Sequence, residues 1–240
     1  MKRETQNILL ILLGGALVKI AVNGDYLRYV KPSQQPWIIA GGAVMVLLGA
    51  VAIVRDILAA RAKSEHSDGH GHAHSARPAW LLLVPVLAVF LVAPPALGAD
   101  SVTRSAAAAP QNTSYGSTAA FPPLPAGDVI TLAVNEFVTR AGWDRANSLT
   151  GRTVSLTGFV VHNEGKTLLA RLVISCCAAD AFPVTVRITG GEADHFASDA
   201  WIQATGQVVP NTATRANGYT PDFNLASVTP VPTPRDPYEY

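Results

Sequence analysis

The stretch Arg171-Leu172-Val173-Ile174-Ser175-Cys176-Cys177-Ala178-Ala179-Asp180 contains both cysteines of this 240-residue chain, side by side after an apolar run. Residues 166–177 are rich in Leu, Val and Ile and contain no Gly or Pro, which predicts a β-strand. Side chains alternate between the two faces of a strand. Cys176 is therefore expected on the apolar core face and Cys177 on the opposite face.

The chemistry of this cysteine pair has three open interpretations. A buried structural Cys176 with an incidental Cys177 is the simplest. A second is a soft-metal site, in which one or both thiolates are joined by Asp180, His162 or His195. The third is a thiol-redox site, including a strained disulfide between neighbours whose Cα atoms are only about 3.8 Å apart. Two thiols on one metal require the strand to bend, and residues 178–180 are the place for such a bend.

Three apolar runs precede this stretch. A mean hydropathy of +0.24 with only 15% charged residues indicates membrane segments. A bilayer core about 30 Å thick needs roughly 17–25 helical residues. The runs predict transmembrane helices at about residues 7–23, 36–56 and 79–98. Lys19, inside the first, either snorkels to the interface or makes a polar contact with a partner helix.

Basic residues predict the orientation of these helices. Six of them lie on the side that holds the amino terminus and the second loop, and three lie on the other side. The excess of Lys and Arg marks the cytoplasmic side. Everything after about residue 99 is then extracytoplasmic. The third run also ends in small residues, as a secretory signal does, which leaves open whether it is cleaved.

A histidine-rich loop, residues 59–77, connects the second and third predicted helices. It contains four of the six histidines, His66, His70, His72 and His74. Neutral imidazoles bind zinc, nickel or copper readily. Exchangeable metal binding and a merely polar loop are both consistent with this composition.

The remainder predicts a linker and a small β domain. Residues 100–126 are rich in Ala, Pro and Ser and predict a flexible linker. A helix capped by Asp128 would present Ile130, Val134, Phe137, Val138 and Ala141 on one face. Strands are predicted at residues 153–161, 167–177, 184–188, 201–209 and 225–231.

These elements predict that residues 127–240 form a small all-β, OB-like extracytoplasmic domain with an accessory helix. Gly158 and Gly206 would allow strands to bend. Trp201 is expected to pack in the core, with a ligand platform as the alternative. His162 and His195 either are solvated or reach the cysteines. The near balance of 18 basic and 17 acidic residues argues against nucleic-acid binding. Without a catalytic motif, we predict that the chain is not an enzyme and has no catalytic residues.

Five stretches resemble a known family. They are Tyr29-Val30-Lys31-Pro32, Thr157-Gly158-Phe159-Val160, Ile174-Ser175-Cys176-Cys177-Ala178-Ala179-Asp180, Trp201-Ile202-Gln203-Ala204-Thr205-Gly206 and Pro237-Tyr238-Glu239-Tyr240. In these stretches the chain resembles the YcgQ-type family of bacterial membrane proteins, described as candidate subunits of a two-component permease. The resemblance implies a multi-pass permease partner and a setting often associated with metal homeostasis, especially that of zinc. It supplies neither a substrate nor metal ligands.

Taken together, the sequence predicts an accessory subunit of a two-component permease in the bacterial cell membrane. It would handle a transition metal ion, zinc or another, and bind the lipid bilayer and the permease but no nucleic acid. The candidate metal ligands are Cys176, Cys177, Asp180, His66, His70, His72 and His74. The alternatives are a stand-alone membrane-tethered metal-binding or thiol-redox protein and a purely structural interaction domain.

Overall fold

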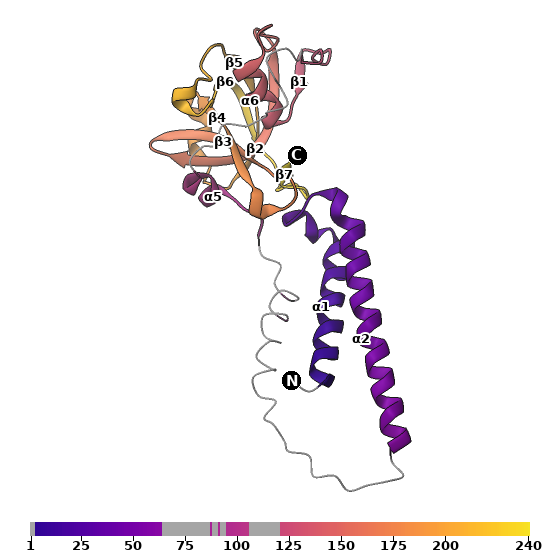
Figure 1. The fold of residues 1–240 in the computed structure, drawn as a ribbon. Coiled ribbons are helices and arrows are strands. Elements are labelled where there is room, and N and C mark those ends of the chain that lie inside the picture. Colours follow the sequence, from indigo (N-terminus) through magenta and orange to yellow (C-terminus); the bar gives the residue numbers. More distant parts are fainter. Residues whose placement is uncertain (1–2, 64–86, 88–90, 92–94, 106–120) are drawn as a thin grey trace. The chain divides into compact units, whose positions relative to one another are not determined.

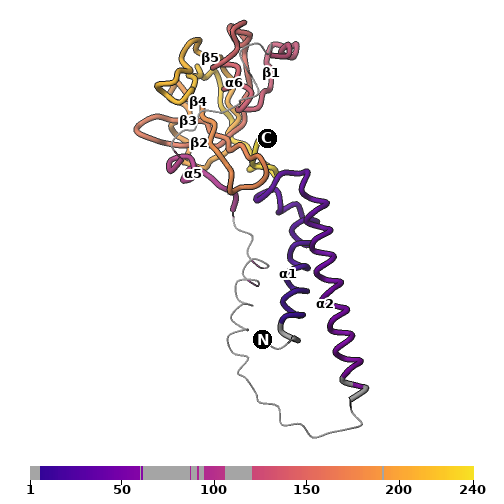
Figure 2. The backbone as a smooth tube through the Cα atoms, in the orientation of Figure 1, coloured from indigo at the N-terminus to yellow at the C-terminus, as the bar shows by residue number. Residues whose placement is uncertain are grey.

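A computed structural model describes residues 3–63, 87, 91, 95–105 and 121–240 (Figure 1). The chain forms two compact units, whose backbone is traced in Figure 2. One unit consists of Met1–Leu27 and Lys31–Pro95. The other consists of Ala96–Tyr240 together with the short segment Arg28–Val30. The second unit therefore includes three residues that come from far upstream in the sequence.

Two long apolar helices dominate the N-terminal unit. They are α1 (Arg3–Asn23) and α2 (Gln35–Lys63), with the 3₁₀ helices η1 (Asp25–Arg28) and η2 (Pro32–Gln34) between them. Both α-helices are long and apolar enough to cross a membrane. The first two predicted helices are thus present. The third predicted helix lies mostly outside the described residues, as do the four histidines of the predicted loop.

Glycines bring α1 and α2 close together. A Cβ atom added to Gly14 would lie 2.7 Å from the carbonyl oxygen of Gly42. One added to Gly42 would lie 2.8 Å from that of Gly14. Small residues let helix backbones approach each other in this way, which increases van der Waals contact where no water is present. Gly41 lies one residue away on α2 and meets nothing within 4 Å.

The C-terminal unit is built on a seven-stranded sheet with one longer helix, α6 (Val134–Trp143). Its strands are β1 (Val129–Thr131), β2 (Thr153–Asn163), β3 (Lys166–Val173), β4 (Phe182–Thr189), β5 (Trp201–Val209), β6 (Asp222–Pro230) and β7 (Tyr238–Glu239). The sheet order is β1-β2-β5-β6-β4-β3-β7, and β2 also pairs with β3. The five strands β2, β5, β6, β4 and β3 therefore form a closed ring.

Neighbouring strands of this ring are antiparallel except β4 and β6, which run parallel. Gly158 and Gly206, predicted as positions where strands bend, lie where neighbouring strands approach closely. A Cβ atom on Gly158 would lie 2.6 Å from the carbonyl oxygen of Ala170, and one on Gly206 would overlap the carbonyl oxygen of Asn224. The register of β5 and β6 shifts between Thr205 and Gly206, which marks a bulge.

The described residues of the domain form two apolar clusters. The larger cluster includes Phe137 of α6 and Phe223 of β6, whose rings meet edge to face at 5.5 Å. The smaller cluster gathers side chains of β2, β3 and β7 with Ala99 and Val102 of the short helix α5 (Ala99–Arg104). Helix α5 thus lies in the stretch predicted as linker and packs on the domain.

Several predicted boundaries were wrong. The helix does not begin at Asp128, because residues 129–131 form β1 beside β2 and bury Ile130 as a strand residue. The predicted strand 167–177 ends at Val173, because its pairing with β4 ends there, opposite Phe182. The chain then leaves the sheet before the cysteines. Strands β4 and β6 begin earlier than predicted.

Candidate thiol site

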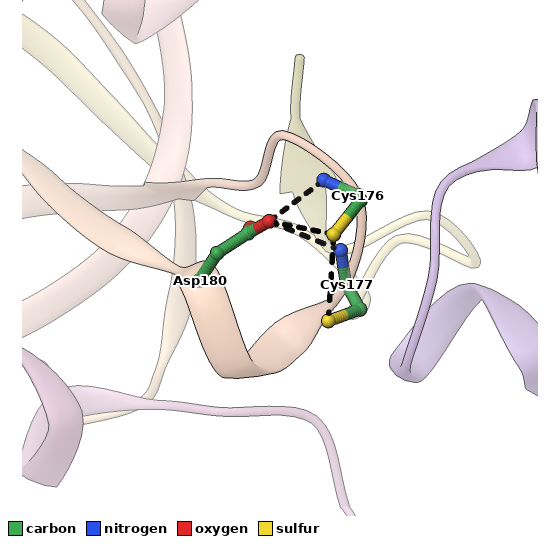
Figure 3. A group of neighbouring side chains, drawn as sticks. All are labelled: Cys176, Cys177 and Asp180. Carbon is green, nitrogen blue, oxygen red and sulfur yellow. Dashed lines mark hydrogen bonds between the residues drawn. The ribbon is translucent and has the colours of Figure 1, made fainter.

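The cysteines lie on a loop that follows β3 and ends in the 3₁₀ helix η3 (Ala178–Asp180). Its shape depends on Asp180, whose carboxylate points back at the loop (Figure 3). Oδ1 accepts a hydrogen bond from the Ser175 N–H at 2.9 Å. Oδ2 accepts one from the Cys176 N–H at 2.9 Å and a longer one from the Cys177 N–H at 3.5 Å. A single carboxylate therefore holds three successive N–H groups.

This turn brings the two sulfur atoms together. The Sγ atoms of Cys176 and Cys177 are 3.7 Å apart, and the Cys176 thiol donates to Asp180 Oδ2 at 2.9 Å. Both cysteines are free thiols. Cys176 is exposed and Cys177 is half-buried, so the prediction that Cys176 points into the core was wrong. The alternation of a strand does not apply once the chain has left the sheet.

The hydrogen bond between Cys176 and Asp180 shifts both groups. Donation to Asp180, together with contact with the Cys177 thiol, raises the pKa of Cys176 to about 11. The same hydrogen bond, with the backbone N–H groups, holds the pKa of Asp180 below its ordinary value. The raised pKa of Cys176 and the lowered pKa of Asp180 agree, because both mean that the shared proton stays on the sulfur atom. Cys176 is therefore a neutral thiol at physiological pH, and a metal that binds it as thiolate must displace that proton.

The opposite edge of the loop pairs with the segment Arg28–Val30. Cys177 forms an antiparallel bridge with Val30. The N–H of Ala178 donates to the carbonyl oxygen of Tyr29 at 2.7 Å. No local signal in the sequence indicates this pairing, because 147 positions separate Val30 from Cys177.

The strand before the loop is fixed by β7. The Ile174 N–H donates to the carbonyl oxygen of Glu239 at 3.0 Å. The Glu239 carboxylate accepts from the N–H groups of Val134 and Asn135 at 2.9 and 2.7 Å and so caps α6. It also pairs with Arg171, whose Nε lies 3.3 Å from Oε1 in a contact that is ionic and not a hydrogen bond by geometry. The base of the loop is thereby anchored to the helix.

Two family models match the chain. The DUF1980 N-terminal domain matches residues 5–107, and the DUF1980 C-terminal domain matches residues 128–240. The chain carries both domains of the DUF1980 family. The function of this family is unknown. No curated protein and no solved structure matches the chain.

These matches place the two sides of the loop in different DUF1980 domains. Cys177 belongs to the DUF1980 C-terminal domain, and Val30 belongs to the DUF1980 N-terminal domain. The bridge between them therefore joins the two domains of the family within one compact unit.

The structure brings together only part of the predicted ligand set. Within the residues it describes, Cys176, Cys177 and Asp180 of this DUF1980 protein form a group whose candidate donor atoms all lie within 4.8 Å of one another. Neither His162 nor His195 joins this group. His162 instead contacts the Thr167 hydroxyl at 3.2 Å and the Phe196 carbonyl oxygen at 2.8 Å.

Trp201 packs against the smaller apolar cluster, in agreement with the prediction of core packing. Its ring lies 5.6 Å from that of Phe159, and the Arg171 guanidinium lies over it at 4.9 Å. This cation–π contact, with the ion pair to Glu239, compensates part of the cost of burying Arg171. Burial still lowers the pKa of Arg171 from its ordinary value, against the opposing effect of Glu239.

Proposed function

We propose that this DUF1980 protein is an accessory subunit of a two-component membrane permease and that its C-terminal domain binds a transition metal ion, zinc in the first instance. The observation that carries the proposal is the pair of thiols on one loop, 3.7 Å apart, with one of them exposed. The permease partner is an inference from the family resemblance of the sequence.

The spacing of the sulfur atoms fits one shared ion. A tetrahedral zinc ion with Zn–S bonds of about 2.3 Å separates two thiolates by about 3.8 Å. The observed 3.7 Å is close to this value, so both cysteines can bind without a large change in the loop. Asp180 Oδ2 would be a third ligand, in exchange for its hydrogen bond with the Cys176 thiol. A site with two or three protein ligands leaves positions open, which suits transfer of an ion more than permanent structural binding.

The proposed setting is a multi-pass protein of the bacterial cell membrane with the C-terminal domain outside the cytoplasm. The two apolar helices and the distribution of Lys and Arg support this placement. We also propose that the closed ring of five strands is an OB-like barrel, which the strand order and the parallel pairing of β4 with β6 support. The barrel would receive or deliver the ion in a non-enzymatic step.

Metal binding by the full-length, reduced protein in detergent tests the site. We expect one zinc ion per chain by elemental analysis after equilibration with zinc, lost in both Cys176→Ser and Cys177→Ser. Ser175→Ala, an exposed neighbour on the same loop, is the control and should keep it. A variant with His66, His70, His72 and His74 changed to Ala separates the histidine loop from the thiol site. Unchanged zinc content in both cysteine variants eliminates the cysteine site.

Cross-linking in native membranes tests the partner. Affinity purification of the tagged chain after cross-linking should enrich a multi-pass transporter. The same transporter should be recovered whichever detergent is used to solubilise the membranes. If only soluble proteins or no proteins are recovered, the permease assignment is wrong even if zinc is bound.

A stand-alone thiol-redox protein is the second candidate. Two adjacent thiols can lose two protons and two electrons to an external disulfide and form a vicinal disulfide. The two sulfur atoms, however, are 3.7 Å apart, which is close to the separation for one shared zinc ion and well beyond the length of an S–S bond. We therefore rank metal binding first. Intact mass after isolation without reductant decides, because only the redox protein is found with the two thiol hydrogens missing.

A further inference from the structure

The segment Arg28–Val30 lies between α1 and α2 in sequence, yet it belongs to the compact unit that carries the thiols. Its backbone makes three contacts there. Val30 pairs with Cys177, the Tyr29 carbonyl oxygen accepts from Ala178, and the Arg28 carbonyl oxygen accepts from the Tyr238 hydroxyl at 3.1 Å. The thiol loop is therefore attached to the connection between the two apolar helices.

A second connection reaches the same place. The Tyr238 hydroxyl also accepts a hydrogen bond from the Leu97 N–H at 3.1 Å. Leu97 is the last residue of the third apolar run in the sequence. Tyr238 is only 2% exposed, so its hydroxyl is committed to these two partners. The buried Tyr238 side chain thus binds Arg28, which lies between the two apolar helices in sequence, and Leu97, which ends the third apolar run.

The connections between this segment and the two helices are short. Four residues, 24–27, separate α1 from Arg28, and four residues, 31–34, separate Val30 from α2. Because Cys177 pairs directly with Val30, the thiol loop is joined to a residue that lies only five positions before the first residue of α2 in the sequence.

The composition of this connection suits a bilayer surface. It contains Arg28, Tyr29 and Lys31, and Trp37 follows in the first turn of α2 with 74% of its surface exposed. Tyr and Trp are enriched at membrane–water interfaces, and Lys and Arg are attracted by anionic headgroups. These residue types occur together in the connection whose residues Arg28–Val30 pair with the thiol loop.

We propose that the face of the C-terminal domain that carries Cys177 lies on the lipid surface, so that the thiol site opens at the bilayer and not into bulk solvent. The inference rests on the membrane placement in the proposed function. It implies that an ion leaves or reaches the thiols at the height of the headgroups, where a membrane-embedded protein and not a diffusing carrier has direct access.

The domain offers an internal reference point. The turn that joins β2 to β3 contains Glu164, and β3 runs from there to the loop with the cysteines. Eight strand residues at about 3.3 Å each put Glu164 on the order of 25–30 Å from Cys177. A label at Glu164 should therefore be far from the lipid if Cys177 is close to it.

Quenching by spin-labelled lipids tests the proposal in full-length protein reconstituted into phosphatidylcholine and phosphatidylglycerol vesicles. One sample is Cys176→Ser with a fluorophore on Cys177, and the other is Cys176→Ser/Cys177→Ser/Glu164→Cys with the same fluorophore. We expect headgroup nitroxides to quench the label at Cys177 several-fold more than the label at Glu164. Equal quenching, or stronger quenching at Glu164, overturns the proposal.

Two further measurements make the outcome unambiguous. Vesicle flotation after an alkaline wash reports whether the chain is inserted at all. A chain that is stripped off removes the membrane placement and this inference with it, whereas an inserted chain with an unquenched Cys177 label removes only this inference. A Val30→Thr variant, which keeps the backbone pairing, should retain the quenching of the parent.

Discussion

Asp180 organises the cysteine loop before it can act as a ligand. Its two carboxylate oxygens already accept from three backbone N–H groups and one thiol. Charge-assisted hydrogen bonds of this kind are stronger than neutral ones. The carboxylate therefore holds the loop in the shape that places the two sulfur atoms 3.7 Å apart.

Replacing Asp180 by Asn should make Cys176 more reactive. The negative charge that accepts from the thiol raises its pKa from 9.0 to about 11, so thiolate is scarce below that pH and appears only as the pH rises through it. Without the charge the pKa falls toward the ordinary value, and alkylation at about pH 8 should accelerate roughly tenfold or more. The measurement is the rate of iodoacetamide reaction against pH in a Cys177→Ser background.

The control for this experiment is Asp194→Asn. Asp194 accepts from the Thr167 hydroxyl at 2.5 Å, at the other end of β3, and its charge should not affect Cys176. Similar acceleration in both variants would show that the hydrogen bond to Asp180 does not set the reactivity.

Glu239→Gln should destabilise the C-terminal domain. It removes the charge that caps α6 and leaves Arg171, a side chain only 10% exposed, without its ionic partner. Breaking a buried pair from one side costs several kcal/mol, and since Gln still accepts one hydrogen bond we expect about 2–4 kcal/mol. Urea unfolding followed by tryptophan fluorescence measures the loss.

Asp100→Asn provides the comparison for that prediction. The ion pair between Asp100 and Arg104 is 72% and 77% exposed at its two side chains, so its loss should change the free energy of unfolding by less than about 1 kcal/mol. If both variants unfold at the same urea concentration as the parent, Glu239 does not hold the domain together.

At the scale of elements, the local sequence pattern predicted the boundaries that local interactions determine. The strands at residues 153 and 201 begin where the alternation of apolar residues predicted, and β5 matches at both ends. The start of α6 was missed, because the residue that caps it is Glu239, over 100 positions away. The end of β3 was missed because the pairing partner, and not the composition of the strand, terminates it.

In the candidate site, too, the sequence predicted the local features but not the contacts with distant residues. Cys176, Cys177 and Asp180 were predicted as neighbours in sequence with a bend after them, and the bend is present. The contributions of Val30 and Tyr238 could not be predicted, since backbone bridges and a buried hydroxyl leave no spacing pattern in the chain. Sequence therefore identified the chemical groups but not what positions them.

The helix pair makes a prediction at the same scale. Gly42→Val should separate α1 from α2, because the new side chain meets the backbone of Gly14, whereas Gly41→Val faces open space and should be tolerated. The Asn7 and Asp56 side chains are hydrogen-bonded at 3.2 Å, so cysteines placed there report the packing. In a background without Cys176 and Cys177, oxidation should link them in the parent and in Gly41→Val but not in Gly42→Val. Equal linking in both variants would show that the helices do not depend on this contact.

At the scale of the whole molecule, the membrane topology is the property on which the proposed function depends. In cells that express the chain without its native cysteines, Glu164→Cys should react with a membrane-impermeant maleimide before lysis. In the proposed topology, three crossings from a cytoplasmic amino terminus would carry the β domain outside. Labelling only after lysis would place the domain in the cytoplasm and contradict the topology.

The segment Arg28–Val30 also dictates what a fragment of this protein can reveal. The ribosome completes these residues long before β7, so they wait through most of translation for the tyrosine and the cysteine loop that they will contact. A soluble piece that starts near residue 96 would be made without them. Its thiols would lie on a loop whose edge is no longer paired with Val30 and Tyr29. Metal affinities measured on such a piece would therefore describe a different site from the one in the intact chain.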